Sequence, residues 1–246
     1  MELKCLGSSS DGNCYLLKDN EGKMLLLDAG VSEKEIKIGC NFKVTDIVGA
    51  CVTHIHLDHS KSVKNLEKMG IRVFKPYADN PDNHKQITSV TFGKFKVTAF
   101  SLDDVGCKVW QHTNADGSEC PIYGFYINHP EITGGLIYAT DAKYIKFNFA
   151  KQKPSVIILG VDYQQDMLDE GTAKTYHQLT GHLSIDTCCD FIKSNNSTNL
   201  GKIVLGHLSH QNSSDEYFIN RVKEHCSSGI YVAYSGMSIN LDSCPF

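Results

Sequence analysis

The chain has 246 residues, of which 41% are hydrophobic, and a formal net charge of −4. This size predicts one globular domain over residues 1–246, because no linker, repeat or low-complexity run divides it. The acidic balance disfavours long nucleic acid as a partner, since phosphate contacts from basic side chains dominate that kind of binding.

The sequence also limits where the protein works. No stretch reads as a transmembrane span, and the start MELKCLGSSS lacks the apolar run of a signal peptide. We therefore expect a cytoplasmic protein. The ten cysteines form no C-x-x-C pair, so we expect them to be buried and reduced rather than paired or bound to structural zinc.

The first half of the chain is predicted to be rich in strands. Short apolar runs bounded by turn residues occupy 2–7, 14–18 and 23–30, and a polar helix is expected over 32–39. The nearly continuous apolar run at 46–54 predicts a strand buried on both faces. A helix is expected over 61–70, with Val63, Leu66 and Met69 on one face and Gly70 at its end.

Further strands and then helices follow. The predicted strands lie at 71–76, 89–93, 95–102, 122–128, 135–141, 155–162, 202–210 and 230–236. Two helices are expected late in the chain, one over 184–196 with Ser184 as its N-cap and one over 213–226 with Ser214 as its N-cap. Two packed sheets with helices outside them, or a mixed α/β layer fold, would both fit this order.

The densest chemical signal is the segment VTHIHLDHSKS, which carries His54, His56, Asp58 and His59 after a buried strand. Residues 54, 56 and 58 of an extended strand point to one side, so His59 joins them only if the chain turns near Asp58. A helix that begins there would provide the turn. Imidazole and carboxylate ligands suit Zn²⁺, and also Mn²⁺ or Fe. Four such groups fill one tetrahedral zinc, so further convergent ligands would require a second ion.

Three later residues are candidates for those ligands. Asp141 and His207 each lie at the end of an apolar strand, and His112 follows a strand in a polar segment near Trp110, the only tryptophan. His129 is the alternative to His112. Any one of them alone would more often be a turn or core residue, but together they supply a set of ligands downstream of the first cluster.

The motif His54-Ile55-His56-Leu57-Asp58-His59 resembles the H-x-H-x-D-H signature of the metallo-β-lactamase fold superfamily. The segment LLLDAG, with Asp28, looks like the acidic motif that precedes this signature. The resemblance implies an α/β fold of the metallo-β-lactamase type, a four-layer αββα sandwich, with a dinuclear metal site at one edge. It covers the chain from about Leu3 to Asn240.

The resemblance also implies a role for each candidate. One ion would be held by His54, His56 and His112, and the other by Asp58, His59 and His207, with Asp141 as the bridge. Asp28 would orient a ligand histidine. Two divalent ions, Zn²⁺ first and Mn²⁺ as the alternative, are the expected cofactors.

A second segment, LTGHLSIDTC, resembles the G-H-S/T segment of tRNase Z-like phosphodiesterases. In that branch this histidine, here His182, protonates the leaving oxygen, a step for which histidine is suited near neutral pH. The alternative is that His182 caps the next helix. Gly160 stands where close relatives tend to carry glutamate, and Asp162 is a substitute partner for His182.

Among the members of this branch, small bacterial and phage enzymes of the anti-Pycsar type are most similar in length, in the opening LGSSSDGN and in the close HLSHQNS. The resemblance implies a cyclic nucleotide phosphodiesterase in which a two-metal-activated hydroxide attacks phosphorus, oriented by Asp58 and Asp141. It also implies a homodimer working in a bacterial or infected host cell, in evasion of anti-phage defence. Trp110 is a candidate for stacking on the base.

Two alternatives remain open at this point. The same site could serve a single-stranded DNA or RNA exonuclease, and a long basic groove beside the metals would favour it. A protein that binds or sequesters a nucleotide without turnover is the non-enzymatic alternative. The full ligand set together with His182 argues against it.

Overall fold

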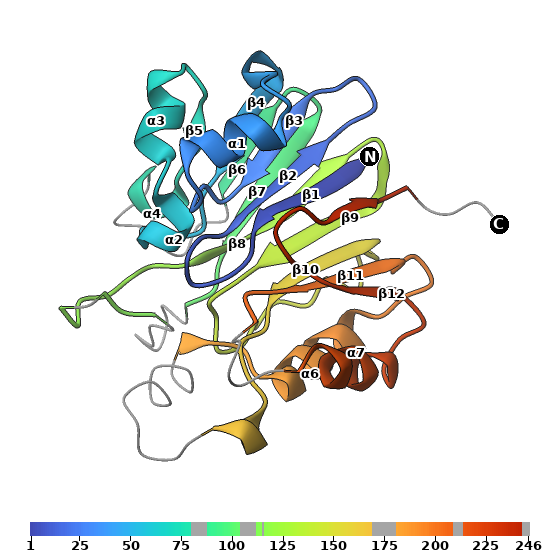
Figure 1. The fold of residues 1–246 in the computed structure, drawn as a ribbon. Coiled ribbons are helices and arrows are strands. Elements are labelled where there is room, and N and C mark those ends of the chain that lie inside the picture. Colours follow the sequence, from blue (N-terminus) through green and yellow to red (C-terminus); the bar gives the residue numbers. More distant parts are fainter. Residues whose placement is uncertain (80–87, 104–111, 115, 169–180, 209–213, 243–246) are drawn as a thin grey trace.

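The computed structural model describes residues 1–79, 88–103, 112–114, 116–168, 181–208 and 214–242. Within these ranges the chain forms two β-sheets that pack face to face (Figure 1). Trp110 lies outside the described residues, as do Cys107 and Cys244. No helix in the described ranges is long and apolar enough to cross a membrane.

The first sheet has six strands in the order β13-β1-β2-β3-β4-β5. Their bounds are Ser238–Asn240 (β13), Glu2–Gly7 (β1), Cys14–Lys18 (β2), Met24–Leu27 (β3), Ile47–Cys51 (β4) and Val73–Phe74 (β5). The pairs β3–β4 and β4–β5 are parallel, and the other pairs are antiparallel.

The second sheet has seven strands in the order β12-β11-β10-β9-β8-β7-β6. Their bounds are Gly229–Val232 (β12), Lys202–Gly206 (β11), Val156–Gly160 (β10), Ile132–Ala139 (β9), Tyr123–His129 (β8), Phe95–Ser101 (β7) and Thr88–Phe92 (β6). The four strands β9 to β12 run parallel, whereas β6 to β9 form an antiparallel meander.

Helices cover the outer faces of both sheets (Figure 1). Beside the first sheet lie α1 (Glu33–Gly39), the 3₁₀-helix η1 (Val44–Asp46), α2 (Leu57–Ser60), α3 (Val63–Lys68) and α4 (Pro76–Asp79). Beside the second sheet lie α6 (Ile185–Asn195) and α7 (Asp215–Lys223). The 3₁₀-helix η2 (Gln165–Met167) follows β10.

Three buried clusters hold these four layers together. The central cluster joins the inner faces of both sheets, with Leu17 and Leu27 from one sheet and Phe125 and Tyr138 from the other. A second cluster packs the outer face of the second sheet against α6 and α7, and a third packs the first sheet against α1 and α3. Each sheet is therefore buried on both faces, which matches the apolar runs of its parallel strands. The predicted αββα sandwich is confirmed.

Local signals in the sequence set several helix boundaries. Ser184 and Ser214 cap α6 and α7 as predicted, since each side chain accepts a hydrogen bond from a backbone N–H of the first turn. Ser32 caps α1 in the same way. Because Ser184 holds the cap of α6, the alternative that His182 caps this helix is wrong.

Two expectations about the elements need correction. The helix expected over 61–70 is shorter, as α3, and a separate short helix, α2, begins at Leu57 and turns the chain after His56. The strand expected at the end, over 230–236, is shorter as β12, and the chain then crosses to the first sheet as β13. The eight described cysteines are all free, and seven of them are buried, as predicted.

Candidate metal centre

The candidate site lies where strand ends of both sheets meet. Asp28 follows β3, and the motif from His54 to His59 follows β4, in the first sheet. Asp141 and His207 follow β9 and β11, the strands on either side of β10 in the second sheet. Strand ends of this kind collect functional groups in α/β folds, because the chain must leave the sheet there.

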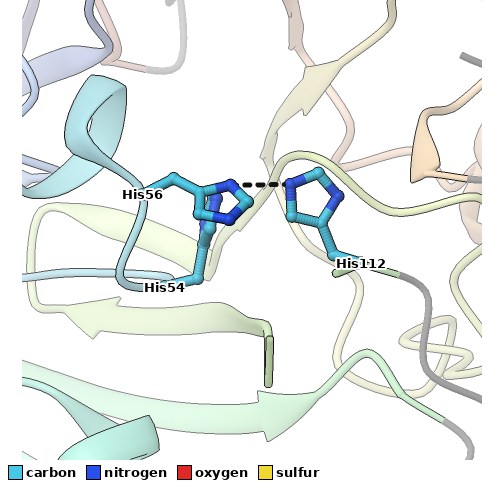
Figure 2. Close-up of side chains that lie close together, drawn as sticks. All are labelled: His54, His56 and His112. Atoms are coloured by element: carbon cyan, nitrogen blue, oxygen red, sulfur yellow. Dashed lines mark hydrogen bonds between the residues drawn. The ribbon is translucent and has the colours of Figure 1, made fainter. Parts of the chain in front are cut away.

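Three histidines form the first group of potential ligands. His54, His56 and His112 each offer a ring nitrogen, and these atoms lie within 4.8 Å of one another (Figure 2). His56 Nδ1 and His112 Nε2 are 2.9 Å apart. Two nitrogens on one tetrahedral zinc lie about 3.3 Å apart, so the pair needs to open by only a few tenths of an ångström to share an ion.

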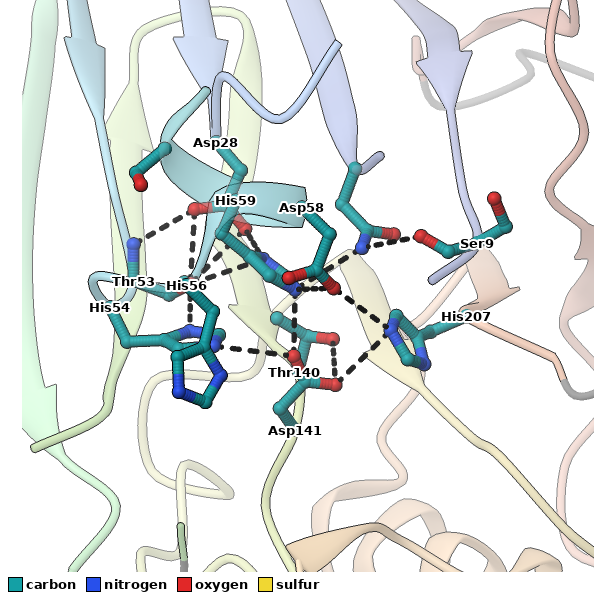
Figure 3. A network of polar contacts seen from close by, with 12 residues as sticks. Ser9, Asp28, Thr53, His54, His56, Asp58, His59, Thr140, Asp141 and His207 are labelled. Atoms are coloured by element: carbon teal, nitrogen blue, oxygen red, sulfur yellow. Dashed lines mark hydrogen bonds and ion pairs between the residues drawn. The ribbon is translucent and has the colours of Figure 1, made fainter. Parts of the chain in front are cut away.

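The second group contains Asp58, His59, Asp141 and His207, again with ligand atoms within 4.8 Å of one another (Figure 3). His59 Nε2 is 2.7 Å from Asp141 Oδ2 and 3.3 Å from Asp58 Oδ2. His207 Nε2 lies 3.5 Å from Asp141 Oδ1 and 3.7 Å from Asp58 Oδ2. The turn into α2 brings His59 beside Asp58, as the spacing of the motif predicts.

Asp141 lies between the two groups. Its Oδ2 is 3.6 Å from His54 Nε2 of the first group and 2.7 Å from His59 Nε2 of the second. The seven candidate residues therefore lie together in two groups, with Asp141 in contact with both, and their role as metal ligands stays a prediction. His129, the alternative to His112, lies elsewhere, in a group with Asp19 and Glu131.

Two buried nitrogens indicate that a metal ion fits here. His54 Nε2 and His207 Nε2 have no hydrogen-bond partner among the described residues. A buried polar atom without a partner costs about 1–3 kcal/mol. A cation at the centre of each group would satisfy these lone pairs, and imidazole with carboxylate is a donor set that zinc and manganese accept.

Asp28 contacts the second group through the ring of His59, on the side away from the other ligands. It is fully buried, and its Oδ2 lies 2.7 Å from His59 Nδ1. The Thr53 N–H donates to Oδ1 at 2.8 Å, and the Tyr138 hydroxyl donates to Oδ2 at 2.5 Å (Figure 3 shows Asp28, Thr53 and His59). The carboxylate thus fixes the His59 ring so that Nε2 faces the site, which is the orienting position predicted for it.

Backbone strain marks the same strand ends. Asp28, Asp141 and His207 have φ angles of 59°, 54° and 58°, in the left-handed region that side-chain-bearing residues rarely adopt. Such strain persists only where the surroundings impose it, and it tends to gather at functional sites. Here the left-handed turn lets each residue leave its strand with its side chain directed into the site.

His182 lies beside the second group. Its Nδ1 is 3.4 Å from Asp141 Oδ1, and its ring stacks on that of His207 with centroids 5.4 Å apart. Asp162, its predicted partner, belongs with His182 and His207 to a further group with ligand atoms within 4.8 Å, and its Oδ1 is 3.8 Å from His207 Nδ1.

Charges in the site shift the titration of its histidines. Burial opposes the charged form of His207, but the Asp141 charge and the contacts with Asp162 and Asp58 outweigh it and raise the pKa of this imidazole to about 10. Burial likewise opposes protonation of His59, whose pKa Asp141 and Asp28 raise well above its usual value. Burial holds the pKa of His54 well below its usual value.

These shifts predict that metal loading releases protons. At pH 8 the metal-free protein carries a proton on His207 that metal ligation must displace, and the raised pKa of His59 adds to this, so we expect at least about one proton released per chain. A pH indicator in weakly buffered solution measures them during zinc addition. His207→Ala should release about one proton fewer. Loading at pH 8 with no proton release would contradict these shifts.

Sequence reasoning missed three residues of the site. Thr53 and Tyr138 hold Asp28, and the Asn13 amide lies 3.1 Å from His59 Nε2. Thr53 precedes the histidine motif directly, which is a usable signal. Nothing in the local sequence of Tyr138 or Asn13 indicates that the chain brings them to the site.

Comparisons with known proteins agree with this architecture. A family model described as the metallo-beta-lactamase superfamily matches residues 9–69, which contain Asp28 and the histidine motif. An exodeoxyribonuclease, YycJ of Bacillus anthracis, is 28% identical over 163 residues. That alignment covers 59% of this chain and 56% of the relative. The chain therefore spans little more than half of the relative's length.

Solved structures are similar over nearly the whole chain. The metallo-beta-lactamase fold protein YhfI of Bacillus subtilis has a TM-score of 0.67 at 17% identity, covering 97% of this chain and 98% of its own. The short form of human tRNase Z has a TM-score of 0.59 at 14% identity, covering 99% and 100%. At such identities the likeness establishes the fold.

Fold and site together define an αββα sandwich with a histidine- and aspartate-lined site for divalent metal at the edge between its sheets. The chain has the metallo-beta-lactamase fold, and its residues 9–69 match the model of that superfamily.

Proposed function

We propose that the protein is a dinuclear metal-dependent phosphodiesterase. The observation that supports this most is the position of Asp141, whose carboxylate faces His54 of one ligand group and His59 and His207 of the other, with His182 at 3.4 Å. Two adjacent cation positions with a proton donor beside them suit attack on a phosphodiester.

In this proposal each residue of the site has a separate role in metal binding or catalysis. His54, His56 and His112 would hold one ion, and Asp58, His59 and His207 the other, with Asp141 shared. Bound ions, zinc first and manganese as the alternative, would supply an activated water and screen the phosphate charge. Asp58 and Asp141 orient the attacking water through their carboxylates, and His182 donates a proton to the leaving oxygen.

The role of His182 has a selective test. Loss of a general acid lowers turnover about 10²–10⁴-fold when the leaving oxygen needs a proton. We therefore expect His182→Ala to show this loss on a nucleotide phosphodiester but a much smaller loss on bis(p-nitrophenyl) phosphate, whose leaving group needs none. Equal losses on the two substrates, with unchanged metal content, would argue against the assignment.

For the substrate we propose a small cyclic nucleotide. The net charge of −4 favours a small ligand over a long polyanion, and the resemblance to anti-Pycsar enzymes supports the same choice. A homodimer and a role in evasion of anti-phage defence stay predictions that rest on this resemblance, and a cytoplasmic location stays a prediction from the sequence.

An exonuclease is the second candidate, because the relative at 28% identity is an exodeoxyribonuclease. A screen decides between them: the protein loaded with Zn²⁺, Mn²⁺ or Mg²⁺ is incubated with cyclic mononucleotides, cyclic dinucleotides and single-stranded DNA and RNA. Cleavage of cyclic mononucleotides supports the first candidate. Intact cyclic nucleotides with degraded single-stranded DNA would establish the second, and nucleotide binding without any turnover would favour the sequestering protein.

A further inference from the structure

Asn13 occupies a fixed position in the loop that joins β1 to β2. Asn13 is buried, with only 2% of its surface exposed. Its backbone N–H donates to the carbonyl of Asp58 at 2.6 Å, and its carbonyl accepts from the Gly30 N–H at 2.8 Å. Gly30 permits this approach, because a Cβ there would lie 1.6 Å from the Asp58 carbonyl oxygen. The loop is therefore held firmly against the segment that carries the metal ligands.

The side chain of Asn13 is directed at the second ligand group. Its Nδ2 donates to the Ser9 carbonyl at 2.9 Å and lies 3.1 Å from His59 Nε2. An amide nitrogen has two hydrogens, and the bond to Ser9 uses one of them. The opposite orientation of the amide would set its oxygen against the Ser9 carbonyl, so the nitrogen belongs where it is. The second hydrogen points toward His59 Nε2.

His59 Nε2 is not an acceptor for that second hydrogen, because it lies 2.7 Å from Asp141 Oδ2 and donates to that carboxylate. His59 Nδ1 faces Asp28, so the lone pair available to an ion is the one on Nε2. Once that nitrogen binds an ion, it likewise cannot accept from Asn13. With or without the ion, a buried N–H donor of Asn13 therefore faces the site and needs an acceptor.

We propose that Asn13 is a substrate-binding residue, whose amide donates a hydrogen bond to a non-bridging oxygen of the phosphate group. A neutral donor fixed beside the carboxylates of Asp58 and Asp141 favours the negative charge that develops on phosphate oxygens. The inference rests on the proposed function, which places a phosphate group at this site. It concerns binding of any phosphate, so it does not depend on the choice between cyclic nucleotide and oligonucleotide.

The test uses metal-loaded wild type, Asn13→Ala and Asn13→Asp, with Asn196→Ala as the matched control because its exposed amide bonds the His225 carbonyl far from the motif. Metal content is measured by elemental analysis, binding of inorganic phosphate by calorimetry, and turnover with bis(p-nitrophenyl) phosphate.

We expect Asn13→Ala to keep its metal, to bind phosphate about tenfold more weakly, and to lose about 10²–10³-fold in kcat. Asn13→Asp offers only acceptors and a like charge, so its loss of phosphate affinity should be at least as large.

The outcomes separate three readings. Unchanged phosphate affinity in both variants, or no phosphate binding by the wild type, would overturn the proposal. Loss of metal in proportion to loss of phosphate would assign Asn13 to positioning His59 instead. If Asn13→Ala does not fold, the near-isosteric Asn13→Asp decides. Phosphate binding that depends on Asn13 in a protein that hydrolyses no phosphodiester would support this inference while contradicting the proposed function.

Discussion

Replacing Asp141 with asparagine is expected to abolish phosphodiester hydrolysis, with a loss of about 10³-fold or more, because one carboxylate serves both ligand groups. Its charge also holds the pKa of His207 high in the metal-free site. Asparagine tolerates the left-handed φ of 54° at this position, so the backbone can stay as it is. The loss of hydrolysis would then result from the missing negative charge rather than from a changed backbone.

Metal content and turnover should be measured together for Asp141→Asn. We expect at least one ion per chain to be lost or bound far more weakly. Asp46→Asn is the control, since Asp46 is a half-exposed carboxylate that pairs with Lys23 on the surface. A variant at position 141 that retains both its ions and its activity would rule out the shared role of this carboxylate.

Asp28→Asn is expected to have the second largest effect, on both stability and metal affinity. Asp28 is fully buried and accepts from the Thr53 N–H and the Tyr138 hydroxyl, with His59 Nδ1 at 2.7 Å. An amide has one acceptor oxygen, so its NH₂ group must face one of these donors. We expect the free energy of unfolding to fall by about 1–3 kcal/mol.

The same substitution loosens the orientation of His59. Loss of a carboxylate that holds a ligand histidine lowers metal affinity about 10–100-fold. Urea unfolding of the metal-free variant measures the change in the free energy of unfolding without any contribution from metal. Competition with a chelator measures the metal affinity. Tyr138→Phe removes one donor only and should show a smaller fall in both quantities. Metal affinity equal to wild type in Asp28→Asn would contradict the orienting role.

Much of the fold follows from local patterns. The apolar runs of the parallel strands, the cap residues Ser184 and Ser214, and the end of β4 at the histidine motif are all readable from the sequence, because each depends on neighbouring residues. The three-residue strand β13 could not be predicted, since only its pairing with β1, more than 230 residues away, makes it a strand.

The site was predictable to a different degree at each position. The motif from His54 to His59 indicates a metal site by spacing alone. His112, Asp141 and His207 needed the resemblance, because their convergence depends on the packing of two sheets. Asn13 could not be found in this way, since a buried amide in a serine-rich loop looks the same in sequence whether it holds a turn or faces a ligand.

The central claim is that the two groups joined by Asp141 hold two ions that act together on a phosphodiester. The most direct measurement is turnover of bis(p-nitrophenyl) phosphate by metal-free protein as zinc or manganese is added in known equivalents. We expect full activity to appear only as the second equivalent per chain binds. Full activity at one equivalent, or no hydrolysis at two, would contradict it.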